Sequence, residues 1–184
     1  LLDQAIDSVD SRVAAGAIRL ARRNGAGALR GALDKRRTLA NRPEVHIQLA
    51  LALGDLPAEG AELKTSAVLL RKLLLEQGED PRLVAAAMSS LGERRRLDAL
   101  FAELDPQKLS AKEWVALETI AKPLIDSILA TRDKAKEPGL PAPLAKFLQA
   151  ILAADEAGKA PIVELCGIVS TFYEALPRHG LTLD

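Results

Sequence analysis

The sequence predicts an all-α protein, arranged as a right-handed α-solenoid of helix pairs with C-terminal capping helices. Apolar residues recur with a helical period along nearly every segment, and the alternating β-branched and aromatic runs that are typical of strands are missing. One helical pattern also returns along the chain, which is the signature of a repeat protein. The chain has 184 residues, 48% of them hydrophobic and 27% charged, which is enough to build a buried core.

Three predicted helices, over residues 10–23, 43–55 and 81–93, share one template. Their apolar anchors are Val13, Ala17 and Leu20 or Ala21 in the first helix, Val45, Leu49 and Ala52 or Leu53 in the second, and Leu83, Ala87 and Leu91 in the third. The second and third copies begin with Pro43 and Pro81, which suits the first position of a helix, and end in Gly54 and Gly92, which suit a left-handed C-cap. The first copy lacks the proline and has Arg22 in place of the glycine.

Two further predicted helices, over residues 26–40 and 61–77, alternate with these three. The spacing and the segment Asp80-Pro81-x-Leu83…Ala87…Leu91-Gly92 resemble HEAT repeats. We therefore expect about three HEAT-like helix pairs in residues 1–104, with the helices of the shared template lining the concave face.

Residues 105–184 are predicted to form a C-terminal helical extension or cap. Ser110 and Glu113 form a capping-box pattern that opens a long helix with Trp114, in which Pro123 predicts a kink. A linker rich in proline and glycine follows over residues 134–143, and two amphipathic helices are expected over 142–157 and 161–176. These last helices belong either to the solenoid or to a separate hairpin.

Composition excludes several classes of function. The 25 basic and 25 acidic residues balance, so no overall field attracts nucleic acid or an anionic membrane surface. One cysteine and two histidines leave little material for disulfides or a metal site, and 3% aromatic residues are few for stacking bases. We predict no catalytic, cofactor-binding or metal-binding residues, and we interpret Cys166 as a small buried hydrophobe. The glycines at 25, 27 and 31 are interpreted as a turn, since no strand precedes them.

Targeting signals are not evident. The first residues show no signal-peptide pattern, and no apolar run approaches the length that crosses a bilayer. We therefore expect no membrane insertion.

Two groups of polar residues are candidates for contact with a partner. Polar positions on the helices of the shared template are the candidate protein contacts: Arg12, Arg19, Glu44, His46, Gln48 and Arg82. Arginines near the helix ends are the candidate anion contacts: Arg22, Arg23, Arg36, Arg37, Arg94, Arg95 and Arg96. Stacking of the repeats could bring these arginines to one edge and bind phosphate, or they could simply be cations that favour helix C-termini.

The segments 42–54 and 80–91, together with the terminal segment 173–183, resemble the HEAT-like region of large bacterial multidomain proteins. In that family a sugar-dehydrogenase-type β-propeller precedes the region and a c-type cytochrome follows it. The resemblance implies a helical spacer, a periplasmic location and a redox neighbourhood, and it implies no enzymatic activity for these residues.

The sequence thus predicts a non-catalytic scaffold or protein-interaction module within a larger redox-associated protein. The alternative is a HEAT-like nucleic-acid-binding protein that uses the arginine clusters at a solenoid edge.

Overall fold

A computed structural model describes residues 2–25, 28 and 42–181. In these residues every regular element is a helix, which confirms the all-α prediction. The elements are α1 (Leu2–Ile6), α2 (Ser11–Arg23), α4 (Pro43–Leu53), α5 (Gly60–Gln77), α6 (Pro81–Ser90), α7 (Arg94–Glu103), the short 3₁₀ helix η1 (Pro106–Lys108), α8 (Ala111–Ala130), α9 (Ala142–Glu156) and α10 (Ile162–Arg178). The helix predicted over residues 26–40 lies outside the described residues.

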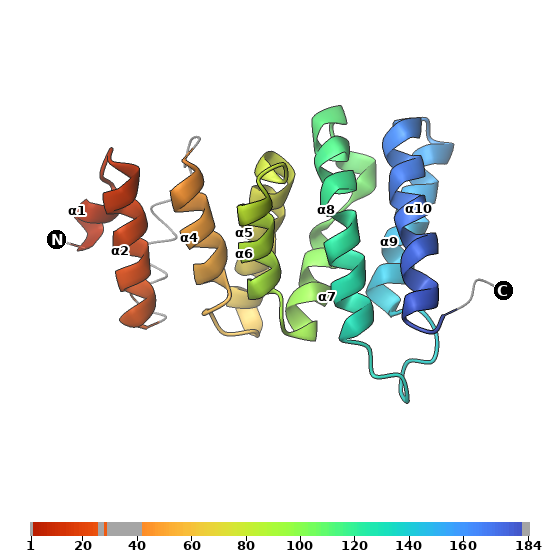
Figure 1. The fold of residues 1–184 in the computed structure, drawn as a ribbon, viewed down its shortest axis with the longest axis horizontal. Helices are drawn as coiled ribbons and strands as arrows, with labels where there is room; N and C mark the ends of the chain where they lie inside the picture. The colour runs from red at the N-terminus through yellow and green to blue at the C-terminus, as the bar shows by residue number, and fades with distance from the viewer. Residues whose placement is uncertain (1, 26–27, 29–41, 182–184) are drawn as a thin grey trace.

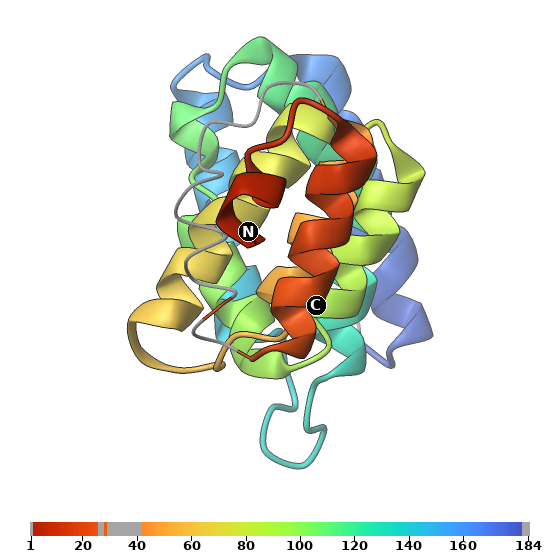
Figure 2. The same ribbon diagram turned by 90° about the vertical axis from the view of Figure 1, so that its left-hand side faces the viewer.

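The helices stand side by side in two rows (Figure 1). Helices α2, α4, α6, α8 and α10 form the first row, in which each helix contacts the next one. Helices α5, α7 and α9 form the second row in the same manner. Figure 2 looks along the stack from the end at which α1 and α2 lie, while α9 and α10 lie at the opposite end of Figure 1.

One hydrophobic core joins the rows. It includes residues from Ala14 to Leu181 and therefore crosses the boundary that we placed after residue 104. Trp114 of α8 is fully buried in it. Helix α10 packs on α8, and α9 packs on α7 and η1, so the last two helices share this core with the helices before them. No described helix is both long and apolar enough to cross a membrane.

The predicted anchors of α4 and α6 are buried, as expected. In α2 the prediction is confirmed in part, because Ala17 and Ala21 are buried, whereas Val13 and Leu20 are exposed and Ala14 and Ile18 are buried instead. Alanines occupy much of α2, so its sequence supports more than one apolar face. The structure buries the face of alanines and Ile18 against α1 and α4 and leaves Val13 and Leu20 in solvent.

The helix ends confirm some of the expected caps and correct others. Proline opens α4 and α6, and glycine at position 25 has a positive φ of 93° just after α2.

Gly54 is not a left-handed cap, because its φ is −71°. A Cβ at Gly54 would lie 2.9 Å from the Cα of Ser90, so the glycine permits close approach of α4 and α6. At this contact the Ser90 hydroxyl donates to the carbonyl of Ala50 at 2.6 Å. Gly92 is not among the described glycines with positive φ either.

The later helices largely follow the prediction. The helix expected over 81–93 ends at Ser90, and α7, which the sequence patterns did not resolve, begins at Arg94. The capping box of Ser110 and Glu113 is present at the start of α8, and α8 continues through Pro123 without interruption. Helices α9 and α10 match the two predicted C-terminal helices within a few residues.

Candidate interaction surfaces

Arginines from two of the predicted clusters converge on the turn that follows α4. The Arg22 Nε donates to a carboxylate oxygen of Asp55 at 2.5 Å. From the other side of the turn, the Arg96 guanidinium donates to the carbonyl of Leu53 at 3.0 Å and also to the carbonyl of Leu56. The structure therefore brings Arg22 and Arg96 to one turn, but it engages both with groups of the chain itself.

Arg96 corrects the prediction of an exposed anion contact. Its side chain is buried, with 5% exposure, and it satisfies backbone carbonyls at the C-terminal end of α4. These carbonyls lack partners within the helix and carry the negative end of the helix dipole, which favours a cation there. Arg96 lies at the start of α7, and the helix C-terminus that it caps belongs to α4.

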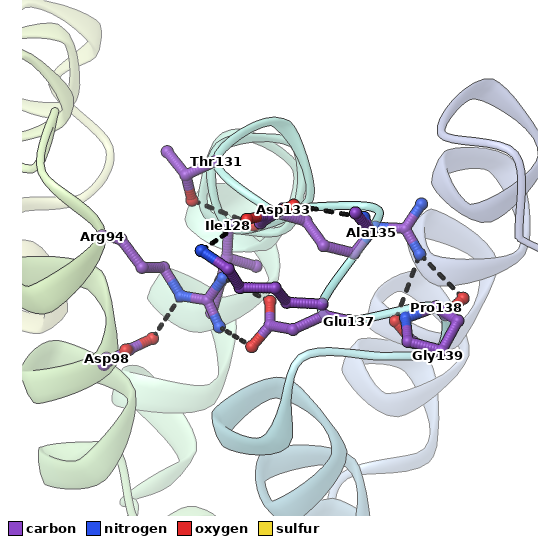
Figure 3. A network of polar contacts seen from close by, with 11 residues as sticks. Arg94, Asp98, Ile128, Thr131, Asp133, Ala135, Glu137, Pro138 and Gly139 are labelled. Atoms are coloured by element: carbon purple, nitrogen blue, oxygen red, sulfur yellow. Dashed lines mark hydrogen bonds and ion pairs between the residues drawn. The ribbon is translucent and has the colours of Figure 1, made fainter.

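Arg94 is held by two carboxylates (Figure 3). Its guanidinium lies 2.6 Å from Asp98 on the same helix and 2.9 Å from Glu137 in the loop between α8 and α9. Burial lowers the pKa of Arg94, but the bonds from Glu137 and Asp98 outweigh burial and raise the pKa above its ordinary value. Arg94 is therefore a structural contact, whereas Arg95 next to it is exposed.

The same loop is tied down at its far end. The Arg132 guanidinium donates to the carbonyls of Pro138 at 3.1 Å, Gly139 at 3.2 Å and His179 at 2.9 Å. The segment that we predicted as a linker thus contacts α7 through Glu137 (Figure 3), and Arg132 joins it to the residue that follows α10.

A cationic pocket of about 310 Å³ lies at the end of α2. Arg19, Arg22, Arg23 and Asp55 line it. Asp55 pairs with Arg22, while Arg19 and Arg23 are exposed and form no ion pair with another described residue. The pocket can accept a carboxylate or another small anion. Arg36 and Arg37 of the remaining cluster lie outside the described residues.

Among the predicted protein contacts, Arg12, Arg19, Glu44 and Arg82 are exposed, and Gln48 is half-buried. They belong to three successive helices of the first row.

His46 corrects its prediction, because it is buried with 4% exposure. Helix α4 has neighbours on both sides in its row, α2 and α6, which leaves only a narrow strip of α4 in solvent. His46 lies off that strip.

Arg82 forms an ion pair with a neighbouring residue at the start of α6. The Arg82 guanidinium lies 3.0 Å from a carboxylate oxygen of Asp80, the residue that caps α6. The hydrogen bond from the Arg82 side chain is the main cause that lowers the pKa of Asp80. The pair is exposed, so it positions Arg82 rather than removing it from solvent.

The sequence did not predict that both ends of the first row are apolar. On α10 the residues Ile162, Val163, Cys166 and Tyr173 are exposed, which corrects the prediction that Cys166 is buried. The reason is that Cys166 faces away from α8, although apolar residues surround it in the sequence. A helical wheel of α10 contains the signal, because these residues form one uncharged arc separate from the buried arc of Ile168 and Phe172.

No group of three or more histidine, cysteine, aspartate or glutamate side chains in the described part of the chain is placed to hold a metal ion. Comparison with models of known families, with curated proteins and with solved structures gave no match in any of the three.

Proposed function

We propose that this chain is a non-catalytic scaffold, a HEAT-like α-solenoid that binds a protein partner along the solvent side of its first row. The supporting observation is a recurrence of charge. Arg12, Glu44, Arg82 and Lys112 are each the second residue of α2, α4, α6 and α8, and all four are exposed. Because these helices are successive neighbours, the four charges form a line across the stack.

A line of this kind suits an extended partner. Repeat proteins contact their ligands through positions that recur once per unit, and the regular spacing of the units sets the spacing of the contacts. Exposed charges at such positions direct the choice of partner more than they add affinity. Arg12 and Arg82 are each paired with the aspartate that caps the same helix, Asp10 at 3.6 Å and Asp80 at 3.0 Å. Together with Glu44 and Lys112 the line therefore carries both signs of charge, which favours a partner segment of mixed charge.

The resemblance to the helical region of bacterial dehydrogenase and cytochrome proteins supports a place for this scaffold in a redox-associated multidomain protein of the periplasm. The gene that encodes the chain tests this proposal. A β-propeller encoded before the chain and a Cys-x-x-Cys-His motif encoded after it are expected, and a gene without either would remove the redox neighbourhood.

A site-specific photo-cross-linking experiment tests the interaction surface. A photoreactive amino acid replaces Ala85 on α6 in the first row or Ala102 on α7 in the second row, both of which are exposed. We expect a partner to cross-link from position 85 and not from position 102. The double variant Arg12→Glu/Arg82→Glu should abolish the cross-link because it reverses the charge line. Equal cross-linking from both positions, or no effect of the charge reversal, would contradict the proposal.

Nucleic-acid binding is the second candidate, and the cationic pocket at Arg19 and Arg23 favours it. Against it, Arg22, Arg94 and Arg96 are engaged by groups of the chain itself. An electrophoretic shift assay with duplex DNA at low salt separates the two candidates. The scaffold proposal predicts no shift, whereas a shift that weakens steeply with salt and is lost in Arg19→Glu/Arg23→Glu would support nucleic-acid binding.

A further inference from the structure

The outward surface of α10 is an exposed face without charge. Ile162 and Val163 are each 74% exposed and Tyr173 is 62% exposed, and Cys166 lies between them on the same arc of the helix. Single exposed apolar residues are ordinary, but a continuous arc along several turns is typical of an interaction site.

The outward surface of α2, at the other end of the row, carries two exposed apolar side chains beside the exposed arginines 12, 19 and 23. Val13 and Leu20 are 46% and 51% exposed, and Gly16 lies between them on the same side of the helix. A glycine within a helix costs about 0.5–1 kcal/mol relative to alanine. No described part of the chain requires this one, because a Cβ at Gly16 would meet no described atom within 4 Å. The glycine instead leaves a notch in which a second helix can approach closely.

Charges at the two ends are complementary. Helix α2 contains four arginines and no acidic residue. Around the uncharged face of α10 lie Glu164 and Glu174, of which Glu174 is 3.6 Å from Arg178 of the same helix, and Asp155 and Glu156 end the neighbouring helix α9. The two faces thus combine apolar centres with opposite charges at their margins.

The direction of the helices fits the same contact. Helices α2 and α10 run in the same direction at opposite ends of the first row (Figure 1). If α10 of one copy lay beside α2 of a second copy, the row would continue with the parallel arrangement that already joins α8 to α10. Counted from the first residue of each helix, Glu174 and Arg23 occupy the same position, so an aligned pair of helices would place them at one level.

We propose that this chain associates head to tail with a second copy of itself, with the face of Ile162, Val163, Cys166 and Tyr173 on α10 packed against the face of Val13, Gly16 and Leu20 on α2. The two surfaces differ, so the interface is heterologous and each added copy presents a fresh α10 face to the next one. This contact uses the ends of the first row, and Arg12 of the charge line lies at its margin, one turn before Gly16.

Sedimentation equilibrium over a wide range of protein concentrations, with a reductant that keeps Cys166 reduced, tests the proposal. The average mass of the wild-type chain should rise with concentration and pass that of a dimer. Leu20→Glu and Val163→Glu should each weaken association by about tenfold or more, because each places a charge in an apolar contact. Val68→Glu is the matched control, since Val68 is a similarly exposed valine on α5 in the second row, and it should associate like the wild type.

A mixture of the two blocked variants gives the decisive result. Leu20→Glu keeps an intact α10 face and Val163→Glu keeps an intact α2 face, so the mixture should form a dimer and stop there. Wild-type chains that stay monomeric at every concentration would overturn the proposal, and so would undiminished association of Leu20→Glu. Circular dichroism checks that the variants fold, and Gly16→Glu, whose side chain enters open space, replaces Leu20→Glu if that variant does not.

Discussion

Replacing Arg96 with alanine should destabilise the protein far more than the same change at Arg95. Arg96 is buried and donates to the carbonyls of Leu53 and Leu56, whereas Arg95 is exposed. The substitution removes a charged donor at the end of α4. It leaves the Leu53 carbonyl with only the Ser66 hydroxyl, 3.4 Å away, and removes the Arg96 bond from the Leu56 carbonyl. Arg96→Ala therefore destabilises α4 as well as α7.

The magnitude follows from these two bonds. A hydrogen bond from a charged group contributes about 1.5–3 kcal/mol, and bonds from one guanidinium do not add in full, so we expect a loss of about 3 kcal/mol. In a domain of this size each kcal/mol lowers the melting temperature by about 2–4 °C, which gives a decrease of about 6–12 °C. Arg95→Ala should change the free energy of unfolding by less than about 0.5 kcal/mol.

Urea unfolding followed by circular dichroism measures both variants. Arg96→Lys adds a third point, because lysine keeps the charge but lacks the planar fork that reaches two carbonyls, and it should fall between the wild type and Arg96→Ala. Equal stabilities of Arg96→Ala and Arg95→Ala would refute the assignment of Arg96 as the cap of α4.

Three further outcomes are expected. Gly54→Ala should destabilise the protein by about 1–3 kcal/mol because its Cβ would collide with Ser90. Gly16→Ala, whose Cβ meets no described atom, should stabilise the protein by about 0.5–1 kcal/mol. If urea unfolding gave free-energy changes of the same sign for the two variants, this contrast would be contradicted. The pKa of Glu113 is lowered, chiefly because its carboxylate accepts a hydrogen bond from a backbone N–H in the capping box. The stabilisation that Glu113 contributes is therefore present above its ordinary pKa of 4.5 and is lost as the pH falls below that value. Glu113→Gln should flatten this part of the profile of melting temperature against pH, and an unchanged profile would count against the cap. Glu137→Gln should speed limited proteolysis of the loop between α8 and α9 severalfold, because it weakens the contact of the loop with Arg94. The cut should release no folded N-terminal fragment, because α9 and α10 share the common core. Release of such a fragment would favour a separate hairpin.

Local signals in the sequence predicted much of the fold. The anchors of α4 and α6, the prolines that open them and the capping box at Ser110 each depend on residues within a few turns of one another. The buried face of α2 was harder to predict from the sequence. Its many alanines define no unique apolar face, so the contacts with α1 and α4 decide which side is buried.

The candidate interaction residues were harder to predict from the sequence than the helices, for a related reason. An arginine run predicts a cationic surface, yet Arg96 is buried because the end of α4, far away in the sequence, needs a donor at that place. Cys166 lies among apolar neighbours and is exposed because no helix covers that side of α10 among the described elements. Gly54 resembles a helix cap in sequence, but its role depends on the approach of Ser90. Each of these outcomes depends on a contact between separate helices.

The three carbonyls held by Arg132 have a consequence for local unfolding. Two belong to the loop before α9 and one follows α10, so a single side chain closes the chain segment that contains both helices. The end of α10 cannot fray without releasing a buried cation, and the loop cannot open without the same loss. The amide protons of α9 and α10 should therefore exchange with solvent as one cooperative unit, and Arg132→Ala should make the two helices exchange separately.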